Sequence, residues 1–412
     1  MDNKKEILEV NTPIEENICT IKLKVGNDTG NSEHKVMING DLIRQPNVIS
    51  RVRNIPILDD VNEKNMIEHI EDNLIVKIMS DNENVETGTY LIGKYALNSG
   101  NKVRSIEIGQ DNDKAESNIV FISTLAQIAG YSVKEAYKNN KLEDKIIANI
   151  DMCGALPITQ HNKVVVNELC KKFMEDSAIV KVVLPSKTIT VELNFDFVNV
   201  LPEGVTTVFA LTEAEDELFE SYNEINEDKL NKEYFKDKRV LHVSIGEGTT
   251  EYPLTEGIAY RPEHIRGSDN GLGIAINKCL PEFMKSKGVP NYTRQKFSEV
   301  IRDKEHKYHV SALDILDFYI DDQSEEILIC SKEELQKANN EVDIILVYGG
   351  GSILMRKYLE PKLKKICDRA EIKLLYIDEK YAVVLECIGL SNFVNSKMWE
   401  AIKKRSLSSL SK

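Results

Sequence analysis

The chain has 412 residues, 42% hydrophobic and 29% charged, which is typical of a globular protein with a substantial core. Its formal net charge of −14 disfavours direct binding to the phosphate backbone of nucleic acid. No apolar run approaches the roughly 18 residues that cross a bilayer, so we expect no membrane contact. The start of the chain is polar and acidic rather than basic and then apolar. We therefore expect a cytoplasmic protein with a flexible N-terminal arm over residues 1–18.

The cysteines and histidines give no sign of a metal site. The seven cysteines are dispersed without a Cys-x-x-Cys pair, which indicates free thiols in a reducing compartment. Only His306 and His309 stand close together, and a zinc site needs at least a third ligand nearby.

Strand-like and helix-like segments alternate along the chain, which favours an α/β architecture. The segment 213–228 holds eight acidic residues and few bulky apolar ones, so we predict a solvated helix or linker there. The predicted strands are residues 18–25, 34–39, 43–49, 89–92, 145–150, 179–184, 189–201, 239–245 and 342–347. The predicted helices are residues 119–129, 163–174, 272–284 and a C-terminal one that includes 398–402.

Three glycine-rich turns follow predicted strands directly. They are Gly26-Asn-Asp28-Thr-Gly30, Ser244-Ile-Gly246-Glu-Gly248-Thr-Thr250 and Gly349-Gly-Gly351-Ser352. Glycines at the end of a strand let backbone N–H groups approach a phosphate closely, and a carboxylate beside them can hold hydrated magnesium. One such turn is weak evidence, and the two commonest nucleotide-binding signatures are absent. The ordered set predicts two turns that clamp a polyphosphate from opposite lobes.

The order of these turns resembles that of the actin, heat-shock chaperone and sugar-kinase ATPase superfamily. The resemblance is closest to the bacterial plasmid-segregation actins of the ParM group. Asp28-Thr-Gly30 followed by Lys35 is similar to the Asp-x-Gly-x4-Lys of that group. Further similar segments, which extend the resemblance from about residue 19 to residue 395, are Tyr90-Leu-Ile-Gly93-Lys-Tyr-Ala96, Gly154-Ala-Leu-Pro157, Val198-Asn-Val-Leu-Pro202-Glu203-Gly204, Leu346-Val-Tyr-Gly-Gly-Gly-Ser-Ile-Leu354 and Glu386-Cys-Ile-Gly389.

The resemblance implies an actin-like, two-lobed α/β fold, with two related ribonuclease-H-like domains around a nucleotide cleft. Domain I would comprise residues 19–236 and 380–412, with a small subdomain at roughly 36–100. Domain II would comprise residues 237–379.

The resemblance also implies roles for residues of the turns. Asp28 would position magnesium through water, and Glu203 would orient or deprotonate the attacking water. Gly30, Asn31 and Ser32 would contact the β- and γ-phosphates, with Lys35 nearby. The residues implied to cradle phosphate or flank the adenosine from the second lobe are Ser244, Gly246, Glu247, Gly248, Thr249, Thr250, Gly271, Gly273, Gly349, Gly350, Gly351 and Ser352.

This sequence departs from the pattern of the family at three places. Ser244 stands where the family has Asp, and serine carries no charge to order magnesium-bound water; Glu247 in the same turn is our candidate to supply that charge. A long stretch separates Glu203 from Ser244, and the usual Asn before Gly389 is missing.

Several of these side chains also have a plain structural interpretation. Asp28 suits an Asx turn, and Glu203 suits a turn carboxylate. For Arg294 and Lys296 we favour a solvated helix face over contact with the nucleoside, and for Trp399 a place in the core.

The function that we expect is an actin-like ATPase that polymerises head to tail with ATP and Mg²⁺, GTP being possible. It would segregate plasmid DNA through a ParR-like centromere-binding adaptor rather than by touching DNA. Two alternatives stay open: a nucleotide-bound filament scaffold with little hydrolysis, and a small-molecule kinase of the same superfamily. A chaperone-like peptide-binding module is a further, less favoured hypothesis.

Overall fold

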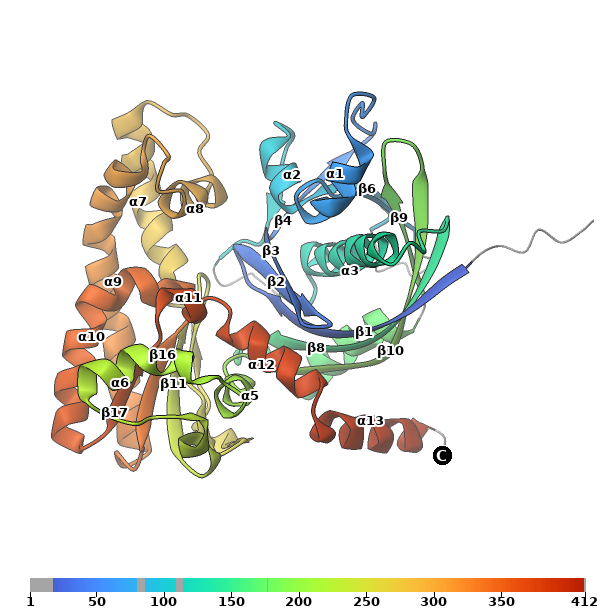
Figure 1. Cartoon of the computed structure of the whole chain (residues 1–412). Helices are drawn as coiled ribbons and strands as arrows, with labels where there is room; N and C mark the ends of the chain where they lie inside the picture. Colours follow the sequence, from blue (N-terminus) through green and yellow to red (C-terminus); the bar gives the residue numbers. More distant parts are fainter. Residues whose placement is uncertain (1–17, 80–85, 109–113, 176, 411–412) are drawn as a thin grey trace, which may run out of the picture.

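The computed structural model describes residues 18–79, 86–108, 114–175 and 177–410. Apart from Ile18, the predicted N-terminal arm lies outside the described residues. The chain forms two lobes, each built on one β-sheet covered by helices (Figure 1). Within the described residues no helix is long and apolar enough to cross a membrane.

The first lobe contains a ten-stranded sheet with the order β3-β2-β1-β8-β10-β9-β5-β6-β4-β7. Its central strands β1, β8 and β10 run parallel. The strands are β1 (Ile18–Thr29), β2 (Glu33–Ile38), β3 (Asp41–Pro46), β4 (Val48–Val52), β5 (Ile75–Met79), β6 (Gly88–Ile92), β7 (Arg104–Ser105), β8 (Lys145–Leu156), β9 (Ala178–Val183) and β10 (Thr188–Pro202).

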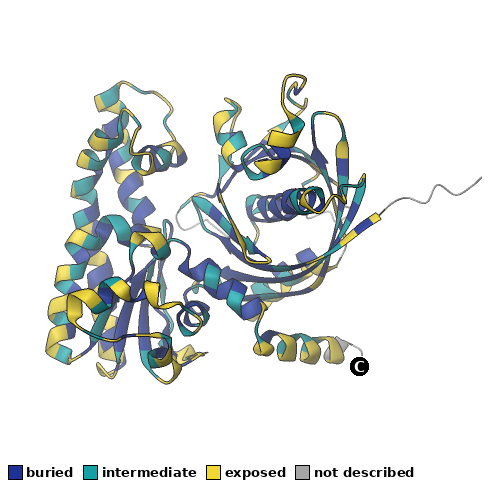
Figure 2. Cartoon of the chain, viewed as in Figure 1, coloured by how far each residue is buried: buried dark blue, intermediate teal, exposed yellow. Residues whose placement is uncertain are grey.

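The first sheet curls around one helix, α3 (Asn118–Lys138), whose residues are buried along most of its length (Figures 1 and 2). A helix that is apolar nearly all round must be enclosed to be stable, so the predicted helix 119–129 is longer than expected and forms the centre of this lobe. The other helices of the lobe are α1 (Glu63–Glu68), the 3-10 helix η1 (Ile70–Asp72), α2 (Gly93–Asn98) and α4 (Lys163–Met174).

The second lobe contains a seven-stranded sheet in which β16 and β17 run parallel to the central strand β11. The strands are β11 (Arg239–Ile245), β12 (Thr250–Glu251), β13 (Leu254–Glu256), β14 (Ala259–Tyr260), β15 (Gly267–Ser268), β16 (Ile344–Tyr348) and β17 (Lys373–Tyr376). The helices are α5 (Thr207–Thr212), α6 (Glu220–Asn226), α7 (Leu272–Lys287), α8 (Arg294–Arg302), α9 (His309–Lys337), α10 (Gly350–Ala370) and α11 (Glu379–Ala382), with the 3-10 helices η2 (Asp216–Leu218), η3 (Lys232–Lys236) and η4 (Pro262–His264).

Side chains of the second sheet alternate between two hydrophobic clusters, as the period of two in a strand requires. Ile345 and Val347 of β16 pack toward α7, α9 and α10, whereas Ile344 and Leu346 pack on the opposite face. That opposite face is covered by the segment 207–236. The predicted solvated segment 213–228 therefore exposes most of its acidic side chains but buries its apolar ones against this sheet.

Two helices return from the second lobe to the first. Helix α12 (Leu385–Val394) packs against β1 and β8, and α13 (Lys397–Leu410) follows it. Trp399 of α13 is fully buried beside Phe197 and Phe393. The domain boundaries stay a prediction, and the packing of residues 207–236 favours a boundary near 206 rather than at 236.

Gly26 of β1 lies directly against the backbone of α12. An added Cβ at Gly26 would lie 2.5 Å from the backbone nitrogen of Ser391, so the helix backbone would have to move. We expect Gly26→Ala to lower the free energy of unfolding by about 1–3 kcal/mol, the usual cost of overpacking. Urea titration at constant m-value measures this change.

Gly350→Ala is the matched control, because an added Cβ there meets nothing within 4 Å. Its stability should stay within about 0.5 kcal/mol of the wild type. Equal effects of the two substitutions would contradict the tight packing of α12.

Candidate active site

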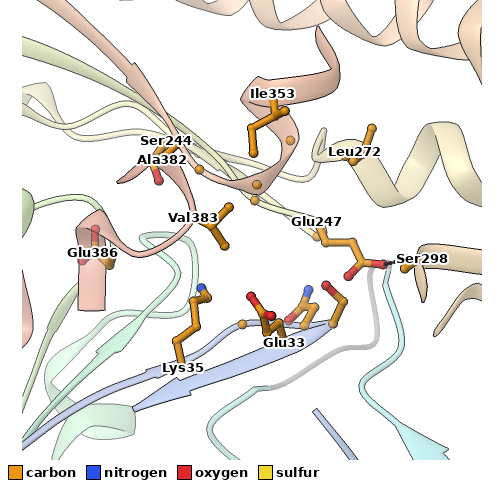
Figure 3. A pocket seen from close by; sticks show the side chains of 18 of the residues that line it. Glu33, Lys35, Ser244, Glu247, Leu272, Ser298, Ile353, Ala382, Val383 and Glu386 are labelled. Carbon is orange, nitrogen blue, oxygen red and sulfur yellow. Dashed lines mark hydrogen bonds between the residues drawn. The ribbon is translucent and has the colours of Figure 1, made fainter. Parts of the chain in front are cut away.

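A cavity of about 320 Å³ lies between the two lobes, large enough for a small-molecule ligand. The Asp28 turn, the Ser244–Thr250 turn and the triple glycine reach it, as do Glu203 and α8. Figure 3 shows Lys35, Ser244 and Glu247 around the cavity. The predicted site residues that line it are Asp28, Gly30, Asn31, Ser32, Lys35, Glu203, Ser244, Gly246, Glu247, Gly248, Thr249, Gly349, Gly350 and Gly351.

Four predicted residues do not line the cavity and instead support the turns that do. Thr250 is fully buried in β12. The backbone nitrogen of Gly271 donates to the oxygen of Gly248 at 3.1 Å, and that of Gly273 donates to Glu247 at 2.7 Å. Ser352 Oγ donates to the Gly349 oxygen at 2.8 Å. Their contacts therefore fix the shape of the second-lobe turns.

The first-lobe turn connects β1 to β2 and carries an ion pair. Asp28 and Lys35 lie opposite each other in the hairpin, and the Lys35 ammonium contacts the Asp28 carboxylate. Burial alone would lower the pKa of Lys35, but the negative charges of Asp28 and Glu33 raise it, so the lysine stays charged. Behind this pair, burial lowers the pKa of His34 to about 3, so a neutral imidazole supports the turn.

The second-lobe turn connects β11 to β12, and its charge is Glu247. Glu247 Oε1 lies 2.9 Å from Arg294 Nε and 3.4 Å from Ser298 Oγ, both on α8 (Figure 3 shows Glu247 and Ser298). The hypothesis that Glu247 replaces the missing Asp charge stays a prediction. Ser244 itself lies directly opposite Glu251 in the strand pair, and burial raises the pKa of that carboxyl well above its usual range.

The two turns touch each other across the cavity. An added Cβ at Gly248 would lie only 1.9 Å from Asn31 Nδ2, so no larger residue fits there without movement. Gln295 Nε2 donates to the Asn31 oxygen at 3.1 Å. Arg294 Nη2 donates to the Ile106 oxygen at 2.6 Å. Helix α8 of the second lobe is thus fastened to the first lobe at two points.

Arg302 at the end of α8 adds an ion pair with Glu33 at 3.5 Å. We call these three contacts, made by Arg294, Gln295 and Arg302, the α8 clasp. The predicted solvated face is therefore wrong for Arg294, whose side chain is only 10% exposed. The sequence does not reveal this role, because no local pattern indicates that the Ile106 carbonyl lies opposite Arg294.

Two carboxyl groups, those of Glu203 and Glu386, lie where the two connections between the lobes meet, and Glu386 joins the connections. Glu203 at the end of β10 forms an ion pair with Lys114, which the sequence did not single out. Glu386 of α12 accepts hydrogen bonds from Gly204 N at 3.0 Å and from the hydroxyls of Thr206 and Thr207 at 2.5 and 2.8 Å. A buried carboxyl therefore joins the segment after Glu203 to α12.

The remaining wall of the cavity is mainly apolar and suits a flat ring system. Its polar and charged members at this end include Ser298, Arg302, Lys304 and Glu379. The apolar residues are Leu272, Ile276, Ile301, Ile353, Leu354, Ala382 and Val383. A ligand with a charged tail toward the two turns and an aromatic base on this wall matches the cavity.

Comparison with solved structures identifies proteins of similar fold. No family model and no curated protein sequence matches the chain. The actin-like protein Alp7A superposes with a TM-score of 0.63 at 17% identity, over 95% of this chain and all of that chain. The archaeal actin homologue Ta0583 gives 0.60 at 15% identity, over 90% and 99% of the two chains.

ParM from Bacillus thuringiensis, solved with ATP, gives a TM-score of 0.56 at 15% identity, over 92% of this chain and 99% of that chain. The chain therefore has an actin-like fold of the ParM type, which confirms the predicted fold class. At these identities the likeness establishes the fold, and the roles of the site residues stay predictions.

The α8 clasp predicts how the lobes respond to a substitution. Arg294→Ala removes the hydrogen bond to Ile106 of the first lobe, so we expect closure to weaken by about 2 kcal/mol, as for a lost hydrogen bond from a charged group. Small-angle X-ray scattering should then report a larger radius of gyration than for the wild type. Arg261→Ala, which removes an exposed ion pair with Glu256 away from the cavity, is the control. Scattering by Arg294→Ala that matches both the wild type and the control would contradict the clasp.

Glu386 predicts a pH dependence of stability. Burial, with the charges of Asp28 and Glu203, raises its pKa from 4.5 to about 7, although bonds from Thr206 and Thr207 oppose the shift. Between pH 4.5 and 7, folding therefore takes up a proton. The contribution of Glu386 to the free energy of unfolding is greatest below pH 4.5 and is lost as the pH rises through 7.

Between about pH 5 and 6.5 the free energy of unfolding of the wild type should fall by about 1.4 kcal/mol per pH unit more than that of Glu386→Gln. Urea titrations at several pH values measure the two slopes. Parallel slopes would show that Glu386 titrates normally.

Proposed function

We propose that the protein is an ATP-hydrolysing, actin-like filament protein of the cytoplasm that moves plasmid DNA through an adaptor. The observation that carries the proposal is the convergence of the Asp28 and Thr249 turns, from opposite lobes, on one cavity that also holds Glu203. The cavity has a polar end with backbone N–H groups and an apolar end for a base. ATP fits this division, and GTP remains an alternative because the apolar wall does not by itself select a purine.

Magnesium is the metal that we propose beside the phosphates. Among the described residues no group of three His, Cys, Asp or Glu side chains could hold a metal by itself. Mg²⁺ characteristically keeps several waters and binds substrate phosphates with one or two carboxylates, and Asp28 in the cavity suits that outer position. Bound there, magnesium would neutralise charge on the phosphates.

Glu203 is the group that we propose to accept the proton of the attacking water. It directly follows β10 at the polar part of the cavity, and its side chain is 17% exposed. Burial of the neighbouring Glu386 and Glu251 raises the pKa of each and favours their neutral forms, so neither competes for this task at lower pH. A carboxylate serves this step without a covalent intermediate.

Assembly is proposed to follow from closure of the lobes. Closed subunits that associate head to tail make a heterologous contact that does not close on itself, which produces a filament. The net charge of −14 argues against direct binding to DNA, so a basic ParR-like adaptor is the proposed link to the cargo. Ser244 favours a second candidate, a nucleotide-bound scaffold with little hydrolysis, because serine supplies no charge where the family has Asp.

The experiment is right-angle light scattering with phosphate release on the purified full-length chain after addition of ATP and Mg²⁺. We expect a rise in scattering that decays as phosphate appears. Glu203→Gln should assemble but release phosphate about 100-fold more slowly or worse, because general-base catalysis contributes at least that factor. Glu213→Gln, an exposed acid outside the cavity, is the matched control and should behave as the wild type.

The other outcomes separate the candidates. A rise in scattering without phosphate release supports the scaffold. No rise, with turnover that depends on an added sugar, supports a kinase and overturns the proposal.

A further inference from the structure

Lys114 is a buried cation at the polar end of the cavity, in the segment that leads into α3. Only 3% of its side chain is exposed, and it lines the same cavity as Asp28 and Ser32. Its backbone nitrogen donates to Gln160 Oε1 at 3.0 Å, which ties this segment to the turn after β8. The position of Lys114 is thus set by the fold rather than by an exposed, flexible chain.

The Lys114 ammonium contacts Glu203 Oε1. A buried ammonium is costly unless it is paired, so this contact stabilises the side chain where it lies. An ammonium carries three N–H donors, and this carboxylate oxygen accepts one of them. While this contact persists, that oxygen shares a lone pair with the lysine and is less available to a water molecule.

Charge balance in the cavity distinguishes Lys114 from the other cations. Lys35 is already matched by Asp28, and Arg302 by Glu33. Lys304 lies just beyond α8, at the apolar end of the cavity. Lys114 is the cation whose partner is the residue proposed to activate water. A terminal phosphate that enters beside Glu203 brings about two negative charges and competes for this ammonium.

We propose that Lys114 recognises the terminal phosphate of a nucleoside triphosphate and, in doing so, releases Glu203. The inference rests on the proposed function and adds the residue that distinguishes triphosphate from diphosphate. In the reaction the water oxygen forms the new bond to the terminal phosphorus. The bond to the bridging oxygen breaks, its electron pair leaves with the diphosphate, and the water proton passes to Glu203. Lys114 holds the transferred phosphate throughout.

Binding of AMPPNP and of ADP to the full-length chain, each with Mg²⁺ and measured by calorimetry, tests the inference. The wild type should bind AMPPNP more tightly than ADP. Lys114→Gln should weaken the affinity for AMPPNP about 10-fold or more, as expected for a lost charged hydrogen bond, and should leave the affinity for ADP within about 2-fold of the wild type. Lys114→Arg keeps the charge and should retain most of the preference.

Lys304→Gln is the matched control, because it removes a cation from the apolar end of the same cavity. It should change the two affinities by a common factor. Glu203→Gln removes the charge that competes for Lys114 and should preserve or increase the preference for AMPPNP, which decides the matter if Lys114→Gln does not fold.

Two results overturn the inference but leave the proposed function standing, provided that the wild type binds both nucleotides. In the first, Lys114→Gln weakens the affinity for AMPPNP and for ADP equally. In the second, it weakens neither affinity. If Lys114→Gln fails to fold, loss of the preference for AMPPNP in Glu203→Gln overturns the inference instead. A wild-type chain that binds neither nucleotide overturns the proposed function together with it.

Discussion

The arrangement of the two lobes depends on one buried carboxyl. Glu386 of α12 binds the backbone of Gly204 and the hydroxyls of Thr206 and Thr207, where the chain leaves the first sheet. At the same crossing a Cβ added to Gly389 would lie 2.2 Å from the Thr206 oxygen, so the two connections are in backbone contact. In the described residues the chain passes between the lobes only at this crossing, which Glu203 immediately precedes.

The crossing and the α8 clasp lie at opposite ends of the cavity and have different physical characters. The crossing is buried, hydrogen-bonded and crowded, so it resists separation. The clasp is made of long side chains, and the Arg302–Glu33 pair is partly exposed, which makes it a weak contact that salt screens. A molecule with one firm and one weak junction opens at the weak one. The side of the cavity beside α8 is therefore the side that we expect to open first.

Much of the fold could be predicted because its signals are local. Alternating apolar runs, the three glycine turns and the apolar helix inside the first sheet are all legible along the chain. Lys114, Arg294 and Glu386 could not be identified in this way, since each acts on a partner that is distant in sequence: Glu203, Ile106 and Gly204, respectively. For the acidic segment 213–228, the exposure of the charged side chains could be predicted from their density. That its apolar residues cover the second sheet could not be predicted from this density.

At the polar end of the cavity, positive and negative side chains are paired. Two acidic side chains here, Asp28 and Glu203, are each paired with one largely buried lysine, Lys35 and Lys114 respectively. Paired in this way, the four side chains carry no net charge, so the protein avoids the cost of isolated buried ions. A polyphosphate changes that balance, because it attracts both lysines and repels both carboxylates. In the proposed function, magnesium beside Asp28 would restore the balance, and the charge of Glu203 would be neutralised by a proton. That proton would be the one that water loses on attack at phosphorus, so binding of the anion and activation of the base would be electrostatically coupled.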